Sequence, residues 1–98
     1  MLEQANIKAL VENAILSLQP ILTIPVDVVM NDKGVIIGMN GVLDSIETIT
    51  LLITIDEKLT ETLGKKLEIT RQIIDDISLS YSKSDLINKI TDLIHSNG

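Results

Sequence analysis

The stretch NGVLDSIETITLLITIDEKL, residues 40–59, carries the strongest helical pattern in the chain and therefore decides its predicted fold. Apolar residues recur in it every three or four positions, which is the spacing of one face of an α-helix. The expected core side of this helix is formed by Leu52, Ile55, Leu59 and Leu63, with Leu51 at its margin. We predict a helix from Ser45 to about Leu63 that stops at Gly64, because glycine readily adopts the left-handed conformation found after many helices.

The start of this helix is marked by Asp44 and Glu47, which form the pattern D-x-x-E, a variant of the capping box. We expect Asp44 to accept a hydrogen bond from a first-turn N–H, and Glu47 to reach back to the Asp44 amide. Ser45 is then the first helical residue, where unpaired N–H groups and the positive end of the helix dipole favour an anion such as phosphate. A serine at a helix start is most often only a capping or surface residue, so this alternative stays open.

A second group of apolar residues lies about a quarter-turn away from the predicted core side of the helix. This isoleucine lobe consists of Ile46, Ile49 and Ile53. Beyond it the same side of the helix turns polar, with Asp56, Glu57 and Thr60. An aliphatic patch beside a hydroxyl, followed by acidic residues, suits a partner with a basic rim. We therefore predict partner contacts at Ile46, Glu47, Ile49, Ile53, Asp56 and Glu57. The alternative is that the loop at 19–41 or the short helix near 68–79 covers the three isoleucines.

Three further segments complete the helical prediction. Residues 2–18 have apolar side chains at helical spacing, and residues 68–79 form a shorter and weaker helical candidate. A last helix follows YSKSD, residues 81–85, with Ser82 or Ser84 as its cap. The residues that we expect this last helix to bury are Leu86, Ile90, Leu93 and Ile94.

Residues 19–41 lie between the first two predicted helices and contain both prolines of the chain. The apolar runs Val26–Met30 and Val35–Ile37 are consistent with a hairpin across the turn sequence NDKG. The competing interpretation is a long loop that its aliphatic residues hold to the helices. Periodicity does not separate the two, because short apolar runs are ambiguous. We predict an all-α fold, a four-helix bundle with a long loop between its first and second helices and a short third helix.

Composition limits the classes of function. The 98 residues fit one small domain, 1–98, and Tyr81 is their only aromatic residue, so we expect a core of Ile, Leu, Val and Met. The chain has no cysteine, which excludes disulfides, cysteine zinc sites and a cysteine nucleophile. A net charge of −6 disfavours nucleic acid as a partner. No apolar run approaches the roughly 20 residues that span a bilayer, and the first residues lack the pattern of a signal peptide. We therefore predict a cytoplasmic protein without a membrane span.

The segment GVLDSIETITLLITIDEKL, residues 41–59, resembles the prosthetic-group attachment segment of acyl carrier proteins. Asp44, Ser45 and Ile46 stand at the Asp-Ser-Leu/Ile signature of that family, which opens the second helix of a four-helix bundle. The aliphatic positions and the acidic stretch of the family are matched as well, the latter by Asp56 and Glu57. Residues 38–70 look most like the stand-alone, specialised carriers, and residues 80–94 are similar to their last helix.

This resemblance implies that Ser45 carries 4′-phosphopantetheine, with Asp44 beside it, and that a magnesium-dependent phosphopantetheinyl transferase takes the group from coenzyme A. It also implies a monomeric carrier that is not itself an enzyme. Its cargo would be an acyl or aminoacyl group held as a thioester on the imported thiol, and its partners the enzymes that activate or transfer such groups. The cargo and the pathway stay open, among them fatty acid, polyketide, peptide and cell-surface polymer routes. Two positions depart from the family pattern: Leu59 replaces a usual phenylalanine, and Thr50 replaces a common acid.

Other chemistry has little support in the sequence. His95 is the only histidine and has no evident partner, so nothing places a base for a serine hydrolase. No spacing of histidine and carboxylate residues indicates a metal site, and we predict neither catalytic residues nor a metal. The alternative function is an unmodified helical module that binds another protein through its exposed isoleucines.

Overall fold

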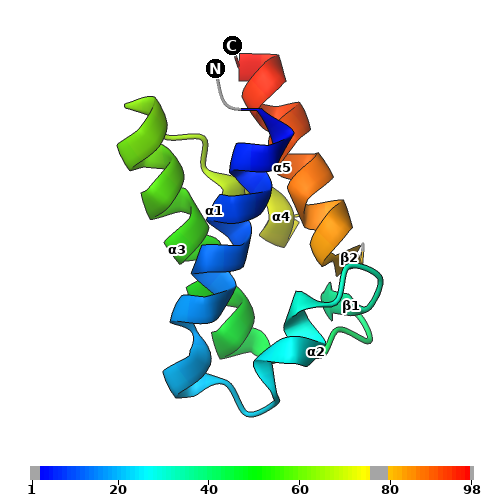
Figure 1. Ribbon diagram of the computed structural model, residues 1–98. Coiled ribbons are helices and arrows are strands. Elements are labelled where there is room, and N and C mark those ends of the chain that lie inside the picture. The colour runs from blue at the N-terminus through cyan, green and yellow to red at the C-terminus, as the bar shows by residue number, and fades with distance from the viewer. Residues whose placement is uncertain (1–2, 76–79, 98) are drawn as a thin grey trace.

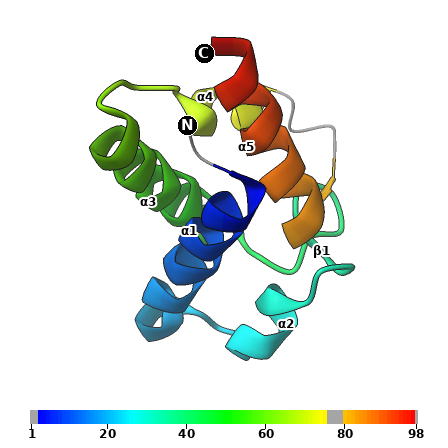
Figure 2. The same ribbon diagram turned by 45° about the horizontal axis from the view of Figure 1, so that its top comes forward.

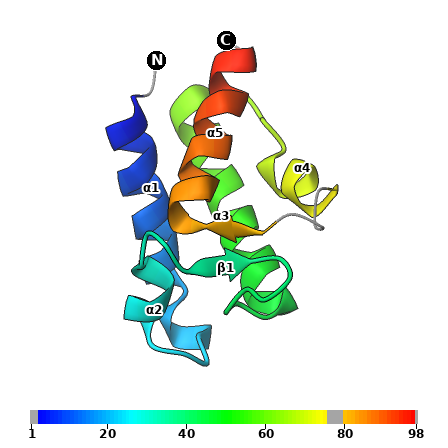
Figure 3. The same cartoon turned by 90° about the vertical axis from the view of Figure 1, so that its right-hand side faces the viewer.

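The computed structural model describes residues 3–75 and 80–97, and most of these residues are helical. Three long helices form the body of the molecule: α1 (Gln4–Ser17), α3 (Ser45–Leu63) and α5 (Lys83–Asn97). Helix α1 packs against both α3 and α5, and Figures 1 and 2 show it lying between them. The short helix α4 (Ile69–Asp75) lies on the other side of α3 and α5 from α1 (Figure 3). This agrees with the prediction of an all-α fold.

The three long helices begin and end close to their predicted bounds. The predicted helix over 2–18 is observed as α1, although Leu2 lies outside the described residues. For α5 the cap is Ser82 rather than Ser84. The Ser82 Oγ accepts a hydrogen bond from the Asp85 amide at 3.1 Å, and Asp85 Oδ2 accepts one from the Ser82 amide at 3.1 Å. The predicted buried side of α5 is confirmed at Leu86, Ile90 and Ile94, while Leu93 is half-buried.

The segment 19–41 contains regular structure that the sequence analysis did not predict. A 3₁₀ helix, η1 (Gln19–Ile21), is followed by helix α2 (Val26–Met30) and strand β1 (Val35–Ile37). The hairpin interpretation is right about a strand at Val35–Ile37 but wrong about its partner, because Val26–Met30 is helical and β1 pairs with strand β2 (Tyr81–Ser82) instead. Pro25 precedes α2 in the extended conformation that suits the position before a helix, and Val29 is fully buried. The loop interpretation is also incomplete, since the segment holds two short helical elements and a strand.

Strand β1 joins the start of α3 to the start of α5. On one side it pairs antiparallel with β2, which leads directly into α5. On the other side the Val35 carbonyl accepts a hydrogen bond from the Val42 amide at 3.2 Å, and the Ile36 carbonyl accepts one from the Leu43 amide at 3.1 Å. Figure 3 shows β1 crossing the molecule where α3 and α5 begin. The residues just before α3 are therefore held by backbone hydrogen bonds.

Helix α4 is shorter in the described residues than the predicted helix over 68–79. It begins at Ile69, because Glu68 has a left-handed backbone conformation with φ of 56°, and residues 76–79 lie outside the described part of the chain. The Asp56 carboxylate of α3 caps α4 from outside. Asp56 Oδ1 accepts a hydrogen bond from the Ile69 amide at 2.7 Å, and Oδ2 accepts from the Thr70 amide at 2.8 Å and the Thr70 hydroxyl at 2.5 Å.

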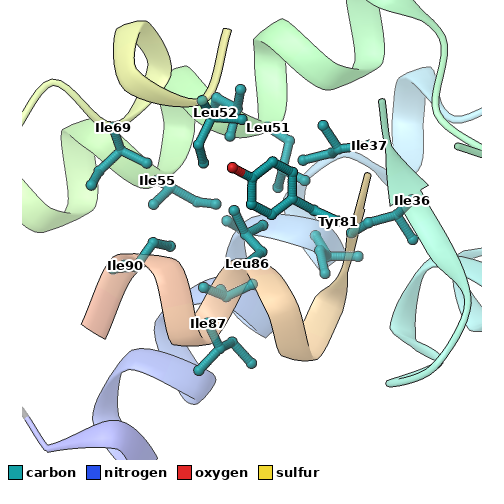
Figure 4. Packing of buried hydrophobic residues seen from close by; sticks show 14 of the residues in the cluster. Ile36, Ile37, Leu51, Leu52, Ile55, Ile69, Tyr81, Leu86, Ile87 and Ile90 are labelled. Atoms are coloured by element: carbon teal, nitrogen blue, oxygen red, sulfur yellow. The ribbon is translucent and has the colours of Figure 1, made fainter. Parts of the chain in front are cut away.

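The core is almost entirely aliphatic, as predicted, but it also includes the single aromatic residue. Tyr81 is only 6% exposed, and Figure 4 shows its ring among Leu52, Leu86 and Ile37. The expectation of a core without an aromatic ring is therefore wrong. Pairing of Tyr81 with β1 brings its side chain under α3, and this long-range contact leaves no local pattern in the sequence.

Lys83, the first residue of α5, is buried with two carboxylate partners. Its Nζ lies 2.5 Å from Glu12 Oε2 of α1 and 3.0 Å from Asp32 Oδ1, in the turn between α2 and β1. Burial works to lower the pKa of Lys83, but the bonds from Glu12 and Asp32 outweigh it and hold the pKa above its ordinary value of 10.5. This cluster ties three separate segments together.

We expect Gly41→Ala to destabilise the fold by roughly 1–3 kcal/mol, which is typical of overpacking. An added Cβ at position 41 would lie 2.7 Å from the Ile36 carbonyl oxygen, and the backbone there cannot move without breaking the contacts of β1. Gly34→Ala is the matched control, because a Cβ at that position meets nothing within 4 Å. Urea unfolding of both variants provides the measurement, and equal midpoints would contradict the prediction.

Candidate functional site

Ser45 is the first residue of α3 and is exposed to solvent. The capping box before it is formed as predicted. Asp44 Oδ1 accepts a hydrogen bond from the Glu47 amide at 2.7 Å, and Glu47 Oε1 accepts one from the Asp44 amide at 2.9 Å. Gly64 ends the same helix in the left-handed conformation, with φ of 73°. The predictions for both ends of this helix are confirmed.

The capping box leaves two amides at the start of α3 without an acceptor. Of the N–H groups that have no partner within the helix, those of Asp44 and Glu47 are used by the box. In the described part of the chain, no group accepts a hydrogen bond from the amides of Ser45 and Ile46. The Ser45 hydroxyl therefore stands at the positive end of the helix dipole, beside donors suited to an anion.

The predicted partner contact at Glu47 is not compatible with its burial. Glu47 is only 2% exposed. Its second carboxylate oxygen, Oε2, accepts hydrogen bonds from the Thr23 amide at 2.9 Å and from the Thr23 hydroxyl at 3.3 Å. The hydrogen bond from the Asp44 amide, and then that from the Thr23 amide, hold the pKa of Glu47 below its ordinary value of 4.5. Glu47 therefore links α3 to the segment between η1 and α2 and is not available to a partner.

The isoleucine lobe is exposed. Ile46 is 73% exposed, Ile49 43% and Ile53 46%, so the alternative that a loop or α4 covers these residues is wrong. Two residues that precede Ser45 in the chain are also exposed and apolar, which the sequence did not indicate: Met39 is 70% exposed and Val42 is 39% exposed. They lie in an irregular connection, where no periodicity separates exposed from buried apolar residues.

The two acidic residues predicted to contact a partner have different environments. Glu57 is exposed, whereas Asp56 is half-buried and its carboxylate is occupied by the start of α4. Asp56 therefore has a structural role in holding the start of α4, and its predicted contact with a partner is not compatible with these bonds. Between α3 and α4 lies a groove of about 600 Å³, and its lining includes Ile53, Glu57, Lys66 and Arg71. The groove thus continues from the isoleucine lobe along α3.

The remaining candidates for chemistry are metal-ligating side chains and the one histidine, His95. No group of histidine, aspartate and glutamate side chains among them is arranged to hold a metal ion, and His95 is exposed in the last turn of α5. Among the helices of the described residues, none has the length and apolar character needed to cross a bilayer.

Comparisons of the chain with protein-family models, with curated proteins and with solved structures give no match. The resemblance to acyl carrier proteins therefore stays a prediction.

We expect exposed and buried isoleucines of α3 to respond differently to substitution. Ile46→Gln should change the free energy of unfolding by no more than about 0.5 kcal/mol, because Ile46 is largely in solvent. Ile55→Ala should cost about 2–5 kcal/mol, because Ile55 is fully buried. Urea unfolding measures both changes, and a large loss for Ile46→Gln would mean that another segment covers the lobe in solution.

The stability that Glu47 contributes should depend on pH. Because its pKa is lowered in the folded state, this stabilisation is complete above the ordinary carboxyl pKa of 4.5 and is lost as the pH falls through the folded-state pKa. Glu47→Gln should cost about 1–3 kcal/mol at pH 7, since it leaves an amide donor facing another donor. The difference in the free energy of unfolding between Glu47→Gln and the wild type should be smaller when unfolding is measured at about pH 3.

The matched control for this pH dependence is Glu57→Gln, which changes an exposed carboxyl on the same helix. The free energy of unfolding of this variant should differ little from that of the wild type at both pH values. A gap for Glu47→Gln that stays constant between the two pH values would show that ionisation of Glu47 does not contribute to stability.

Proposed function

We propose that this chain is a carrier protein with 4′-phosphopantetheine attached to Ser45. The observation that carries the proposal is the exposed Ser45 hydroxyl at the first position of a long helix, between Asp44 and Ile46, with two free amides beside it. A buried serine would not be accessible to a modifying enzyme. The sequence pattern and the surroundings of the residue therefore support the same role.

The order of the helices supports the same proposal. A carrier of the family that the sequence resembles is expected to have four helices, the third of them short, with a long connection after the first. Helices α1, α3, α4 and α5 follow this order, and α2 is an addition within the long connection. Helix α3, which begins at the attachment residue, packs against both α1 and α4.

The residues at the start of α3 fit the group. In the attachment reaction the Ser45 hydroxyl oxygen forms a bond to the pantetheine phosphate of coenzyme A. The bond between that phosphorus and the leaving adenosine 3′,5′-bisphosphate breaks, and the hydroxyl proton passes to a base of the transferase. The amides of Ser45 and Ile46 and the helix dipole favour the phosphate that then remains on the serine. When attached, the group supplies a thiol that holds an acyl or aminoacyl cargo as a thioester.

Partner enzymes would approach along the exposed side of α3. The isoleucine lobe offers an apolar contact next to Ser45, and Glu57 lies exposed further along the helix. With a net charge of −6, the chain favours partners whose binding surface is basic. The partners that we propose are a phosphopantetheinyl transferase and enzymes that load or unload an acyl or aminoacyl group.

The second candidate function is an unmodified interaction module. The exposure of Ile46, Ile49 and Ile53 favours it, because neighbouring apolar side chains in solvent commonly mark a binding surface. The two candidates differ in whether Ser45 is modified.

The test is to incubate the purified chain with coenzyme A, Mg²⁺ and a broad-specificity phosphopantetheinyl transferase and to measure its mass. We expect a gain of one phosphopantetheine group in the wild type and no gain in Ser45→Ala. Ser84→Ala is the matched control, because Ser84 also lies in the first turn of a helix, and this variant should be modified like the wild type. An unmodified wild-type chain would favour the interaction module.

A further inference from the structure

Glu47 is placed to do more than complete a capping box. A capping box needs only the contact between Glu47 and the Asp44 amide. Here the second carboxylate oxygen reaches Thr23, which is 24 residues earlier in the chain, and accepts both its amide and its hydroxyl. The carboxylate is buried, and its hydrogen bonds are made to Asp44 and Thr23 of the protein itself. It thus links the stretch around Thr23 to the residues on either side of Ser45, in addition to the bonds that β1 makes to Val42 and Leu43.

We infer that Glu47 is a positioning residue for the modification of Ser45, which it serves by fixing Asp44 next to the acceptor residue and by holding Thr23 at the start of α3. This inference rests on the proposed function. Ser45 lies next to Asp44, whose amide and carboxylate are both bonded to Glu47, and it is two residues before Glu47 itself. These bonds restrict the backbone on either side of Ser45, and so limit the positions that its hydroxyl can take.

Thr23 adds a second element to this arrangement. It lies between η1 and α2, outside both. The bond from the Thr23 amide to Glu47 holds this stretch beside the start of α3. A transferase that binds around Ser45 therefore meets a surface that is already ordered. Preorganised geometry of this kind raises the rate of a bimolecular transfer.

The substitution Glu47→Gln separates the role in positioning from a simple effect of charge. Glutamine keeps the size of the side chain, but its amide nitrogen replaces one acceptor and must face a donor at either Asp44 or Thr23. The substitution also removes a negative charge near the acceptor serine. Loss of that charge does not add repulsion toward the anionic coenzyme A, and weaker attraction to a basic transferase would raise KM. A lower kcat therefore indicates altered positioning.

The experiment measures the steady-state kinetics of phosphopantetheine transfer, with coenzyme A and the transferase fixed and the carrier varied. We expect Glu47→Gln to lower kcat by about tenfold or more, with KM changed by less than about threefold. The matched control is Asp85→Asn, which changes the corresponding third residue of the capping box of α5, far along the chain from Ser45. Its kcat should stay within about threefold of the wild type.

A second measurement does not depend on the transferase. Amide hydrogen exchange should accelerate at Thr23 and Asp44 in Glu47→Gln, because both amides lose or weaken their acceptor. The same amides should exchange as in the wild type in Asp85→Asn. If Glu47→Gln does not fold, Glu47→Asp takes its place. It keeps the charge but is one methylene shorter and cannot reach Asp44 and Thr23 together.

The outcomes separate this inference from the proposed function. If the wild type is not modified at Ser45, the proposed function fails and the inference fails with it. If the wild type is modified but Glu47→Gln has the kcat of Asp85→Asn, the positioning role is wrong while the carrier function stands. A rise in KM with an unchanged kcat also overturns the inference, because it would assign Glu47 to binding of the transferase.

Discussion

The structure depends on the hydrogen bonds that strand β1 makes on both of its sides. The three residues of β1 bond to Val42 and Leu43 on one side and pair with Tyr81 and Ser82 on the other. Helix α3 begins just after the first of these contacts and α5 just after the second. The same pairing brings Tyr81 into the core. Because both helix starts are fixed at one strand, the segment 19–41 does not merely connect α1 to α3 but sets where α3 begins.

The parts of the fold that the sequence predicted are those with a local signal. The bounds of α3 follow from apolar spacing, from Asp44 and Glu47 at one end and from Gly64 at the other, all within a single stretch. The pairing of Val35–Ile37 with Tyr81–Ser82 was not predicted, since it joins residues more than 40 positions apart and either segment alone is too short to identify its partner. Helix α2 was missed for the same reason, because five apolar-rich residues fit a strand as well as a helix.

The candidate site was predicted in part for a related reason. Which side of α3 carries apolar residues follows from spacing, and the exposure of Ile46, Ile49 and Ile53 agrees with it. Whether each carboxylate of α3 faces solvent or bonds to another segment does not follow from spacing, because it depends on which distant amides need an acceptor. Glu47 turns inward to Thr23, and Asp56 turns to the start of α4, so the acidic surface of α3 is smaller than its sequence indicates.

The burial of Lys83 also bears on its reactivity as an amine. A lysine at the first position of a helix meets the unfavourable end of the dipole, and Glu12 and Asp32 offset both this and the loss of water. Their bonds keep the amine protonated, and a protonated amine has no lone pair with which to attack an activated carbonyl. Acylating labels directed at lysine will therefore react more slowly with Lys83 than with exposed side chains such as Lys8 and Lys33 for as long as the chain is folded.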